Sequence, residues 1–199
     1  MQGSLRAADP TRMRSLLATA AASLALAAGA SPASAAITTT CPDQASAPVF
    51  SPWLDPSDYF LAPDGGFEHS ADGWSLDGAS VVDGNDPFAL SGPGTHSLSL
   101  PSGASATSPS VCVGLEHPTF RYVFRKASGT PLSTLRVSAV FPSGVAVPVG
   151  TVTGSSSWSP SPVTLIGANL LVDAVSFRFT ATSGGWQVDD VHVDPRGSK

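Results

Sequence analysis

Apolar and polar residues alternate with a period of two along most of the chain after residue 64, which is the pattern of half-buried β-strands. The alternation predicts strands over residues 74–82, 97–100, 108–113, 120–126, 132–141, 145–152, 174–181 and 186–193. Turn-forming sequences such as Gly84-Asn85-Asp86-Pro87 and Ser183-Gly184-Gly185 separate nearly every pair. Eight or nine short strands joined by tight turns, without sustained helical periodicity, predict an all-β antiparallel sandwich or barrel.

The alternation also gives each predicted strand an inner and an outer side. The inner sides carry the expected core residues, namely Phe120, Tyr122, Phe124, Leu135, Val137, Ala139, Phe141, Val175, Phe177 and Phe179. The outer sides carry four arginines: Arg121, Arg125, Arg136 and Arg178. One interpretation is a sheet face that binds an anionic ligand such as an acidic glycan, because Arg bonds carboxylates through its planar fork. The other is a solvated face where the arginines pair with Asp and Thr across strands.

Residues 1–35 have the pattern of a secretory signal peptide. Arg6, Arg12 and Arg14 precede an apolar run over 16–28, and Ala33-Ser34-Ala35 is a small-residue cleavage site. Met13 is an alternative start to Met1, because the same apolar run follows it closely. The run is shorter than the roughly 20 residues of a membrane span, and no later segment is longer. We therefore expect a secreted, extracellular protein without a transmembrane segment.

The remainder of the chain divides into an arm, a domain and a short tail. Five prolines prevent a continuous strand over residues 36–63, so we expect an extended arm there. The domain follows over 64–195, and 196–199 form a polar tail. This length suits a single domain, which we expect to be a monomer. A formal net charge of −5 argues against nucleic acid as a partner. The bias toward Ala, Ser, Pro and Gly and the absence of Asn-x-Ser/Thr sequons suit a bacterial protein.

Cys41 and Cys112 are the only cysteines in the chain. In an exported protein an even pair most simply forms one disulfide. Neither cysteine has a His or a second Cys at metal-ligand spacing, so a thiolate metal site is not expected. The disulfide would attach the proline-rich arm to the domain.

Five short motifs, each different, are spread through the predicted domain. They are Gly65-Gly66-Phe67-Glu68, Gly73-Trp74, Val81-Val82-Asp83-Gly84, Ser97-Leu98-Ser99-Leu100-Pro101 and Trp186-Gln187-Val188-Asp189-Asp190-Val191. Together they resemble the galactose-binding-like jelly rolls, a group that includes many carbohydrate-binding modules of secreted hydrolases. The resemblance covers roughly residues 64–194 and implies a β-sandwich jelly roll. It says less about function, because such folds host many unrelated binding roles.

The same resemblance implies a structural calcium between the first and last strands. Its carboxylate ligands would be at the positions of Glu68 and Asp190, with backbone carbonyls from nearby turns. Calcium takes six to eight hard oxygen ligands, so a Glu and an Asp from strands adjacent in space suit it. The alternative is that Glu68 only accepts hydrogen bonds from loop amides, while the Asp pair ends an edge strand in solvent.

Sugar binding in such modules needs flat aromatic surfaces on which saccharide rings stack. The candidates are Trp53, Tyr59, Phe60, Trp158 and Trp186, whereas Trp74 is expected in the core. Trp158 lies in a serine-rich loop, so exposure is one interpretation. A ring that packs over the end of the sandwich is the other.

The sequence contains no recognisable catalytic constellation. It lacks a Gly-x-Ser-x-Gly elbow and a His-Glu-x-x-His helix, and its four His are scattered. We therefore expect a secreted non-catalytic domain that resembles a carbohydrate-binding module, with a polysaccharide or cell-wall ligand. The alternatives are a cell-surface protein-interaction domain without sugar binding and, more weakly, a small secreted hydrolase with two carboxylates in one cleft.

Overall fold

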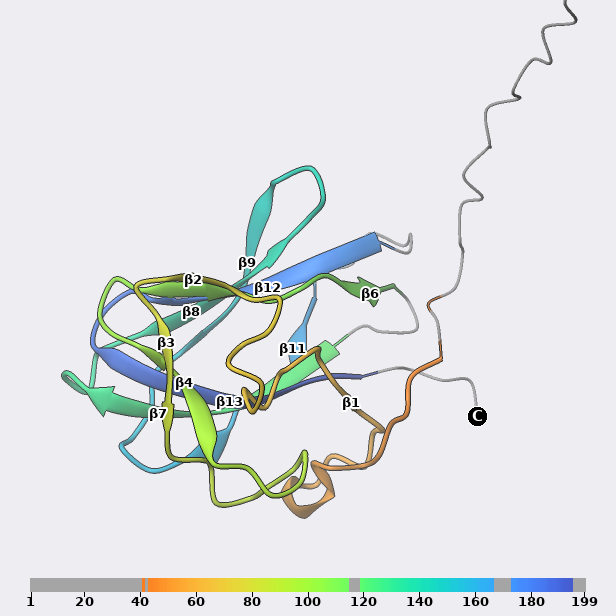
Figure 1. Cartoon of the computed structure of the whole chain (residues 1–199), viewed down its shortest axis with the longest axis horizontal. Helices are drawn as coiled ribbons and strands as arrows, with labels where there is room; N and C mark the ends of the chain where they lie inside the picture. The colour runs from red at the N-terminus through yellow and green to blue at the C-terminus, as the bar shows by residue number, and fades with distance from the viewer. Residues whose placement is uncertain (1–40, 42, 115–118, 167–172, 195–199) are drawn as a thin grey trace, which may run out of the picture. The chain divides into compact units, whose positions relative to one another are not determined.

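The computed structural model describes residues 41, 43–114, 119–166 and 173–194 (Figure 1). The predicted signal peptide (1–35), the start of the predicted arm (36–40) and the predicted tail (196–199) lie outside these residues. The described residues form two antiparallel β-sheets packed face to face, with one 3-10 turn at Ser51–Trp53. Within this part of the chain, no helix is long and apolar enough to cross a membrane. The predicted all-β sandwich is confirmed.

The first sheet has the strand order β10-β7-β13-β4-β3, with β1 paired to β13 and β11 paired to β7. We call it the β13 sheet. Its strands are β1 (Phe60–Leu61), β3 (Ser80–Asp83), β4 (His96–Leu100), β7 (Thr119–Ser128), β10 (Ser159–Pro160), β11 (Thr164–Leu165) and β13 (Gly185–Asp194). Strand β13 lies between β7 and β4 and is buried at every position from 185 to 193.

The second sheet has the strand order β2-β5-β12-β8-β9, with β6 paired to β12. We call it the β12 sheet. Its strands are β2 (Ser75–Asp77), β5 (Ser105–Thr107), β6 (Val111–Val113), β8 (Leu135–Val140), β9 (Ala146–Val152) and β12 (Asp173–Ala181). In Figure 1 this sheet forms the upper layer and the β13 sheet the lower one.

The core lies between the two sheets and contains the residues that the alternation placed on the inner sides. Phe120 of β7 stacks on Phe177 of β12 with 4.3 Å between ring centroids, which joins the two layers. Trp74 also packs in this core, as expected, and its indole N–H donates to the Pro63 carbonyl at 2.9 Å. Phe141 is only partly buried and packs against the core from its margin. The period-two pattern therefore predicted the core correctly.

Two predicted strands differ in the structure: one is divided and one is shortened. The segment 74–82 becomes β2 and β3, which lie in different sheets and are separated by Gly78. The φ of Gly78 is 68°, in the left-handed region that favours glycine, and the chain passes there from one sheet to the other. The segment 108–113 is interrupted by Pro109, which has no N–H for a ladder, so strand β6 begins only at Val111. The short β1, β5, β10 and β11 were not predicted, because strands of two or three residues leave no clear alternating pattern.

The first and last parts of the domain lie side by side. The Ala62 N–H donates to the Val191 carbonyl at 2.9 Å, and the Val191 N–H donates to the Gly65 carbonyl at 3.0 Å. A Cβ atom on Gly65 would lie 2.7 Å from the Val191 carbonyl oxygen, so this close approach requires glycine. These backbone contacts hold the start of the domain against its last strand.

The proline-rich arm is attached to both sheets. Its strand β1 pairs with β13, whereas Cys41 forms a disulfide with Cys112 of β6 in the β12 sheet. The predicted disulfide is therefore present in the structure. It joins residues 71 positions apart in the sequence.

Removing the disulfide is expected to destabilise the domain. We expect the variant Cys41→Ser/Cys112→Ser to lose about 4 kcal/mol in free energy of unfolding, because the unfolded chain would no longer be closed into a long loop. Urea denaturation of the variant measures the loss, and reduced wild-type protein is the control. Equal unfolding midpoints for oxidised and reduced wild-type protein would contradict this expectation.

Candidate functional site

Strand β13 carries two consecutive aspartates at a β-bulge. Its register against β7 shifts between Asp189 and His192. Asp190 has a φ of 47°, a left-handed conformation that Asp adopts more readily than most residues. Asp189 and Asp190 are 0% and 2% exposed in a central strand, so the interpretation of an Asp pair ending an edge strand in solvent is wrong.

Both carboxylates hold the loop that joins β3 to β4. Asp189 Oδ2 accepts the Asp86 N–H at 3.1 Å. Asp190 Oδ2 accepts the Leu90 N–H at 2.9 Å, and its Oδ1 accepts the Ser91 hydroxyl. Asp86 Oδ1 in turn accepts the Phe88 N–H at 2.7 Å, which closes a turn within the loop. The loop is therefore fixed over the outer face of β13.

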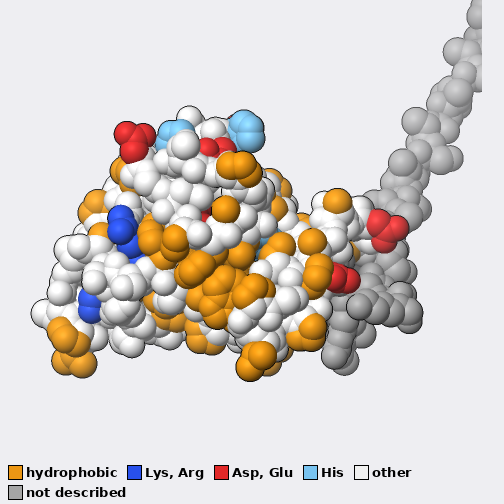
Figure 2. Space-filling model, turned by 90° about the horizontal axis from the view of Figure 1, so that it is seen from below, with side chains coloured by type: hydrophobic (Ala, Val, Ile, Leu, Met, Phe, Trp, Pro, Cys, Tyr) orange, Lys and Arg blue, Asp and Glu red, His pale blue; other side chains and the backbone are white. Residues whose placement is uncertain are grey.

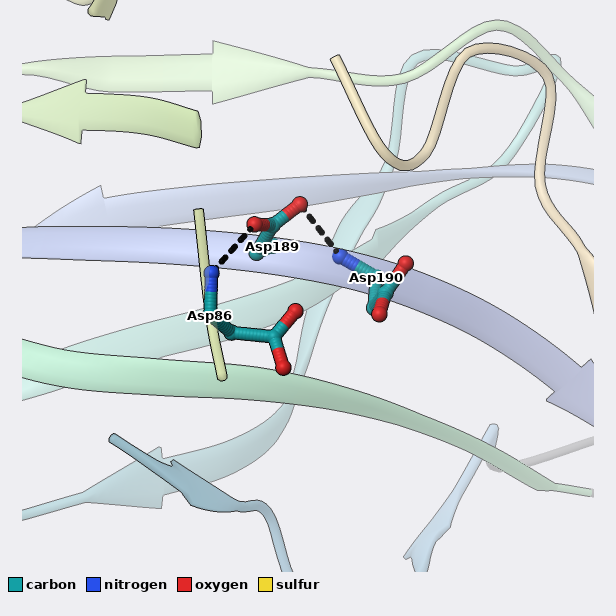
Figure 3. A group of neighbouring side chains, drawn as sticks. All are labelled: Asp86, Asp189 and Asp190. Carbon is teal, nitrogen blue, oxygen red and sulfur yellow. Dashed lines mark hydrogen bonds between the residues drawn. The ribbon is translucent and has the colours of Figure 1, made fainter. Parts of the chain in front are cut away.

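The carboxylates of Asp86, Asp189 and Asp190 converge, and the Asp86 carboxylate points toward Asp190 (Figure 3). We call these residues the aspartate triad. One oxygen of each lies within 4.8 Å of the others. Asp86 is 4% exposed, and its Oδ2 is a buried atom with no hydrogen-bond partner among the described residues. A buried oxygen of this kind is costly unless a proton or a cation satisfies it.

The protonation of the triad reflects this crowding. Burial, followed by repulsion from Asp190, raises the pKa of Asp86 to about 7. Burial, together with the charges of Asp190 and Asp86, raises the pKa of Asp189 to about 8. In the described part of the chain, no ion pair joins a triad carboxylate to a basic side chain. None of the described residues therefore gives the three carboxylates a counter-charge.

The donor set of the triad suits a hard divalent cation. All three ligands are oxygens, as calcium prefers, and calcium–oxygen distances of about 2.3–2.6 Å allow two ligands of one ion to be up to about 5 Å apart. The 4.8 Å limit within the triad is compatible with that spacing. The free Oδ2 of Asp86 is available as a ligand.

Glu68 lies in the segment between β1 and β2, and its carboxylate bonds the end of the β3–β4 loop. Its Oε1 accepts the Thr95 N–H at 2.8 Å and the His96 N–H at 2.9 Å. Partial burial opposes ionisation, but the hydrogen bonds from His96 and Thr95 outweigh it and lower the pKa of Glu68 to about 2. Glu68 thus accepts loop amides, as one of the two interpretations predicted, and it is not one of the three convergent carboxylates.

The four arginines do not share one face. Arg121 and Arg125 lie on β7 in the β13 sheet, whereas Arg136 and Arg178 lie on β8 and β12 in the other sheet. The two sheets present their outer faces on opposite sides of the sandwich, so the expectation of a single arginine-bearing face is wrong.

Arg121 is also buried, contrary to its expected exposure. It is 6% exposed, because the arm and the segment before β11 cover this part of β7. Its Nη1 bonds Asp55 Oδ2 at 2.9 Å, its Nε and Nη2 donate to the Ser161 carbonyl, and its guanidinium lies 4.3 Å from the Phe50 ring centroid. Arg121 is therefore a structural residue that anchors the arm.

Arg125 and Trp158 are brought together by the pairing of β10 with β7. The Arg125 guanidinium lies 5.0 Å from the Trp158 ring centroid, which is a cation–π contact. Its Nε donates to the side-chain oxygen of Gln187, a buried residue on the outer face of β13. Gln187 thus fixes Arg125, and Arg125 supports the half-buried ring of Trp158.

Of the other candidate aromatics, only Trp53 keeps comparable exposure. Tyr59, Phe60 and Trp186 are 2%, 4% and 0% exposed and cannot present a flat surface. Trp53 is half-buried and contacts the half-buried Phe88 edge-on, with 4.8 Å between centroids. Figure 2 shows many hydrophobic side chains gathered on the side of the molecule seen from below Figure 1, where the β13 sheet lies.

Three residues of this region were missed by the sequence analysis. Asp86 was interpreted only as part of the turn 84–87, although an Asp in a loop that follows a strand is also a candidate ligand. Asp189 was not separated from its neighbour, because the alternation contains no signal for the bulge. Gln187 carries no charge and no motif of its own, and only the register with Arg125 reveals its role.

Solved structures with this fold include carbohydrate-binding modules. The CBM22-1–GH10 modules of an endo-1,4-beta-D-xylanase 10B from Clostridium thermocellum, complexed with xylohexaose, have a TM-score of 0.52 at 17% identity; the match covers 68% of this chain and 28% of that one. The CBM22-1 xylan-binding domain of Xyn10C from Paenibacillus barcinonensis has a TM-score of 0.50 at 13% identity, with 70% and 99% covered. The tandem CBM22-1–CBM22-2 domain of that protein gives 0.51 at 13% identity, with 71% and 47% covered.

These similarities establish the fold, which is the β-sandwich of carbohydrate-binding modules. No family model matches the sequence, and no curated protein does. The chain spans about a quarter of the length of the two-module xylanase structure.

The lowered pKa of Glu68 predicts a pH-dependent stability. The folded pKa of about 2 lies below the ordinary value of 4.5, so the ionised carboxylate stabilises the fold above about pH 4.5, and this contribution is lost as the pH falls toward 2. We expect the melting temperature of Glu68→Gln to lie below wild type near pH 6 and to approach it near pH 2. Thermal melts from pH 2 to 7 measure this, with Asp43→Asn, an exposed carboxylate of the arm, as the control. A pH-independent difference would contradict the assignment.

Proposed function

We propose that this chain is a secreted, non-catalytic domain that binds a polysaccharide on the outer face of its β13 sheet. The observation that carries the proposal is the half-buried Trp158 ring supported by Arg125, which is itself bonded to Gln187. The fold supports it, since the similar structures include a xylan-binding domain and modules complexed with xylohexaose. The signal-like residues 1–35 support secretion.

Trp158 has the properties of a saccharide platform. Stacking of a sugar ring needs an aromatic surface that is accessible and held in one orientation. The guanidinium of Arg125 covers part of the indole, and the bond to Gln187 limits the movement of that guanidinium. The ring is thus pre-organised, which reduces the entropy lost when a ligand binds.

The surrounding surface adds further apolar area. Trp53 of the arm and Phe88 of the β3–β4 loop form an edge-on pair, and both are half-buried. The backbone N–H of Phe88 is bonded to Asp86, so the aspartate triad determines the position of this ring. In this way the triad would affect ligand binding without touching the ligand.

Burial of the carboxylates supports a non-catalytic role. A glycosidase needs two carboxyl groups that face one cleft and reach the glycosidic bond. Asp189 and Asp190 are covered by the loop they hold, and Glu68 accepts bonds from two loop amides. None of these three is placed to attack or protonate a substrate.

A second candidate function is protein binding without sugar recognition. Leu54, Leu132 and Leu165 are 96%, 85% and 68% exposed, and a partner protein could cover such side chains. The saccharide is preferred because the aromatic rings are held by named contacts, whereas the three leucines lie on separate elements, namely the arm, the β7–β8 turn and β11. Polysaccharide binding by the purified domain distinguishes the two functions.

We further propose that the aspartate triad binds calcium. The support is the convergence of three buried carboxylates, to which no described residue gives a counter-charge, and the free oxygen of Asp86. Of the two predicted calcium ligands, Glu68 and Asp190, this proposal retains Asp190. Asp86 and Asp189 take the place of Glu68. The ion would hold the β3–β4 loop against β13, and its role would be structural.

Mutation of Trp158 tests the proposed binding site. We expect Trp158→Ala to weaken binding to neutral polysaccharides such as xylan, β-glucan and galactan about tenfold, the equivalent of about 1.4 kcal/mol. Isothermal titration and affinity electrophoresis measure the effect. Leu132→Ala, which removes an exposed apolar side chain from the β7–β8 turn, is the matched control and should bind like wild type. If wild type binds no polysaccharide, or if both variants bind equally well, the proposal is wrong.

Calcium addition and removal test the triad. We expect calcium in about hundredfold excess over its dissociation constant to stabilise chelator-treated protein by about 2.7 kcal/mol, which raises the melting temperature by several degrees. Asp86→Asn and Asp189→Asn should lose this response, whereas Glu68→Gln should keep it. Loss of the response in Glu68→Gln alone would restore the pair of Glu68 and Asp190. No response in wild type would exclude the site.

A further inference from the structure

We propose that the outer face of the β12 sheet is a second binding face, which takes an extended polysaccharide that carries carboxylates. It lies on the other sheet from Trp158 and contains Arg136 and Arg178, the two arginines that the fold separates from Arg121 and Arg125. The proposal goes beyond the proposed function, because it concerns another surface and another ligand chemistry.

Strand register arranges the residues of this face in rows that cross the sheet. One row is Asp77, Ser105, Thr180, Arg136 and Thr151, from β2 through β5, β12 and β8 to β9. The next row is Ser75, Thr107, Arg178, Ser138 and Pro148. Side chains alternate along a strand, so the positions between the rows point inward. Those positions include Ala106, Phe179 and Val137, all 0% exposed, which confirms that the rows point outward.

The two arginines on this face have no anionic partner within the described part of the chain. Arg136 is exposed and forms no ion pair there, and Arg178 is half-buried and donates only its Nε, to Thr107 Oγ1 at 3.1 Å. Asp77 shares a row with Arg136 but lies three strand spacings away, about 14 Å. That distance exceeds the screening length of about 8 Å at physiological salt. The charges of both arginines therefore remain available to a ligand.

The geometry suits two carboxylates on one chain. Arg178 pairs with Ser138, two residues from Arg136 on β8, so the two arginines are diagonal neighbours with Cβ atoms about 7–8 Å apart. The terminal nitrogens of Arg178, and the whole fork of Arg136, can bond carboxylates in the planar bidentate manner. Apart from Ser138, which is 8% exposed, the Ser and Thr hydroxyls of the rows can donate to and accept from sugar hydroxyls.

The chemistry of the rows favours an acidic sugar polymer over nucleic acid. The rows contain two cations and no aromatic ring, so they offer neither many phosphate contacts nor a stacking surface for bases. A polyuronate, with one carboxylate and several hydroxyls per sugar, matches both the arginines and the hydroxyl rows.

The experiment compares one polymer in two charge states. Affinity electrophoresis is run with polygalacturonate and with its fully methyl-esterified form, in buffer without added divalent cations. We expect wild type to bind polygalacturonate and not the ester, and about 0.5 M NaCl to abolish binding, because exposed charges are screened. Arg136→Gln/Arg178→Gln should bind polygalacturonate roughly fivefold or more weakly, as expected for two exposed charge pairs.

Control variants distinguish this face from the β13 sheet. Lys126→Gln removes the same kind of charge from the β13 sheet, and Trp158→Ala alters the proposed neutral-sugar site; both should retain wild-type binding to polygalacturonate. Arg136→Gln alone, at an exposed position, should still weaken binding if the double variant fails to fold. Equal binding to the ester, undiminished binding by both arginine variants, loss of binding in Trp158→Ala, or equally strong retention by single-stranded DNA would each overturn the proposal.

Discussion

The rest of the structure depends on the burial of strand β13 on both of its faces. The strand lies between β7 and β4, and its residues from 185 to 193 are all buried. One face supplies Trp186 and Val188 to the core, as a strand in a sandwich must. The other face carries Gln187 and Asp189, and these polar side chains need partners once they leave water. Arg125 of the neighbouring strand β7 bonds Gln187, and the β3–β4 loop supplies the Asp86 N–H to Asp189, so burial of this strand determines where that loop packs.

The bulge in β13 is where local preference and the fold conflict most. Asp190 has a positive φ, and two neighbouring carboxylates are buried beside a third, that of Asp86. A left-handed non-glycine residue and a buried charge cluster each cost free energy, and natural proteins keep such features chiefly where they serve a purpose. Backbone N–H groups of Asp86 and Leu90 offset part of that cost. They do not reach Asp86 Oδ2, which leaves the triad, and not Glu68, with a buried carboxylate oxygen that no described residue bonds.

The alternation predicted what faces the core but not what covers the outer side of a strand. Phe120, Phe177 and Val137 were placed correctly, because a period of two decides which side of a strand is apolar. The same pattern placed Arg121 on the outer side of its strand, which is correct. The residue is nevertheless buried, because irregular segments pack over it. Such segments have no periodicity from which their position could be read. The passage between sheets at Gly78 and the bulge at Asp190 were missed for a related reason, since a single residue decides each.

The covering segments also explain why the two outer faces differ in chemistry. Over the β13 sheet, the arm, the β3–β4 loop and the β10 segment bring Trp53, Phe88 and Trp158 onto strands whose own outward residues are mostly polar. Strands β12 and β8 keep their own residues at the surface, in Ser, Thr and Arg rows set by register alone. The surface chemistry of the β13 sheet thus depends on the sequence of the covering segments. That of the β12 sheet depends on every second residue of its own strands. Because the inward positions of both sheets form the core, the residues of either outer face can change without altering the core that separates them.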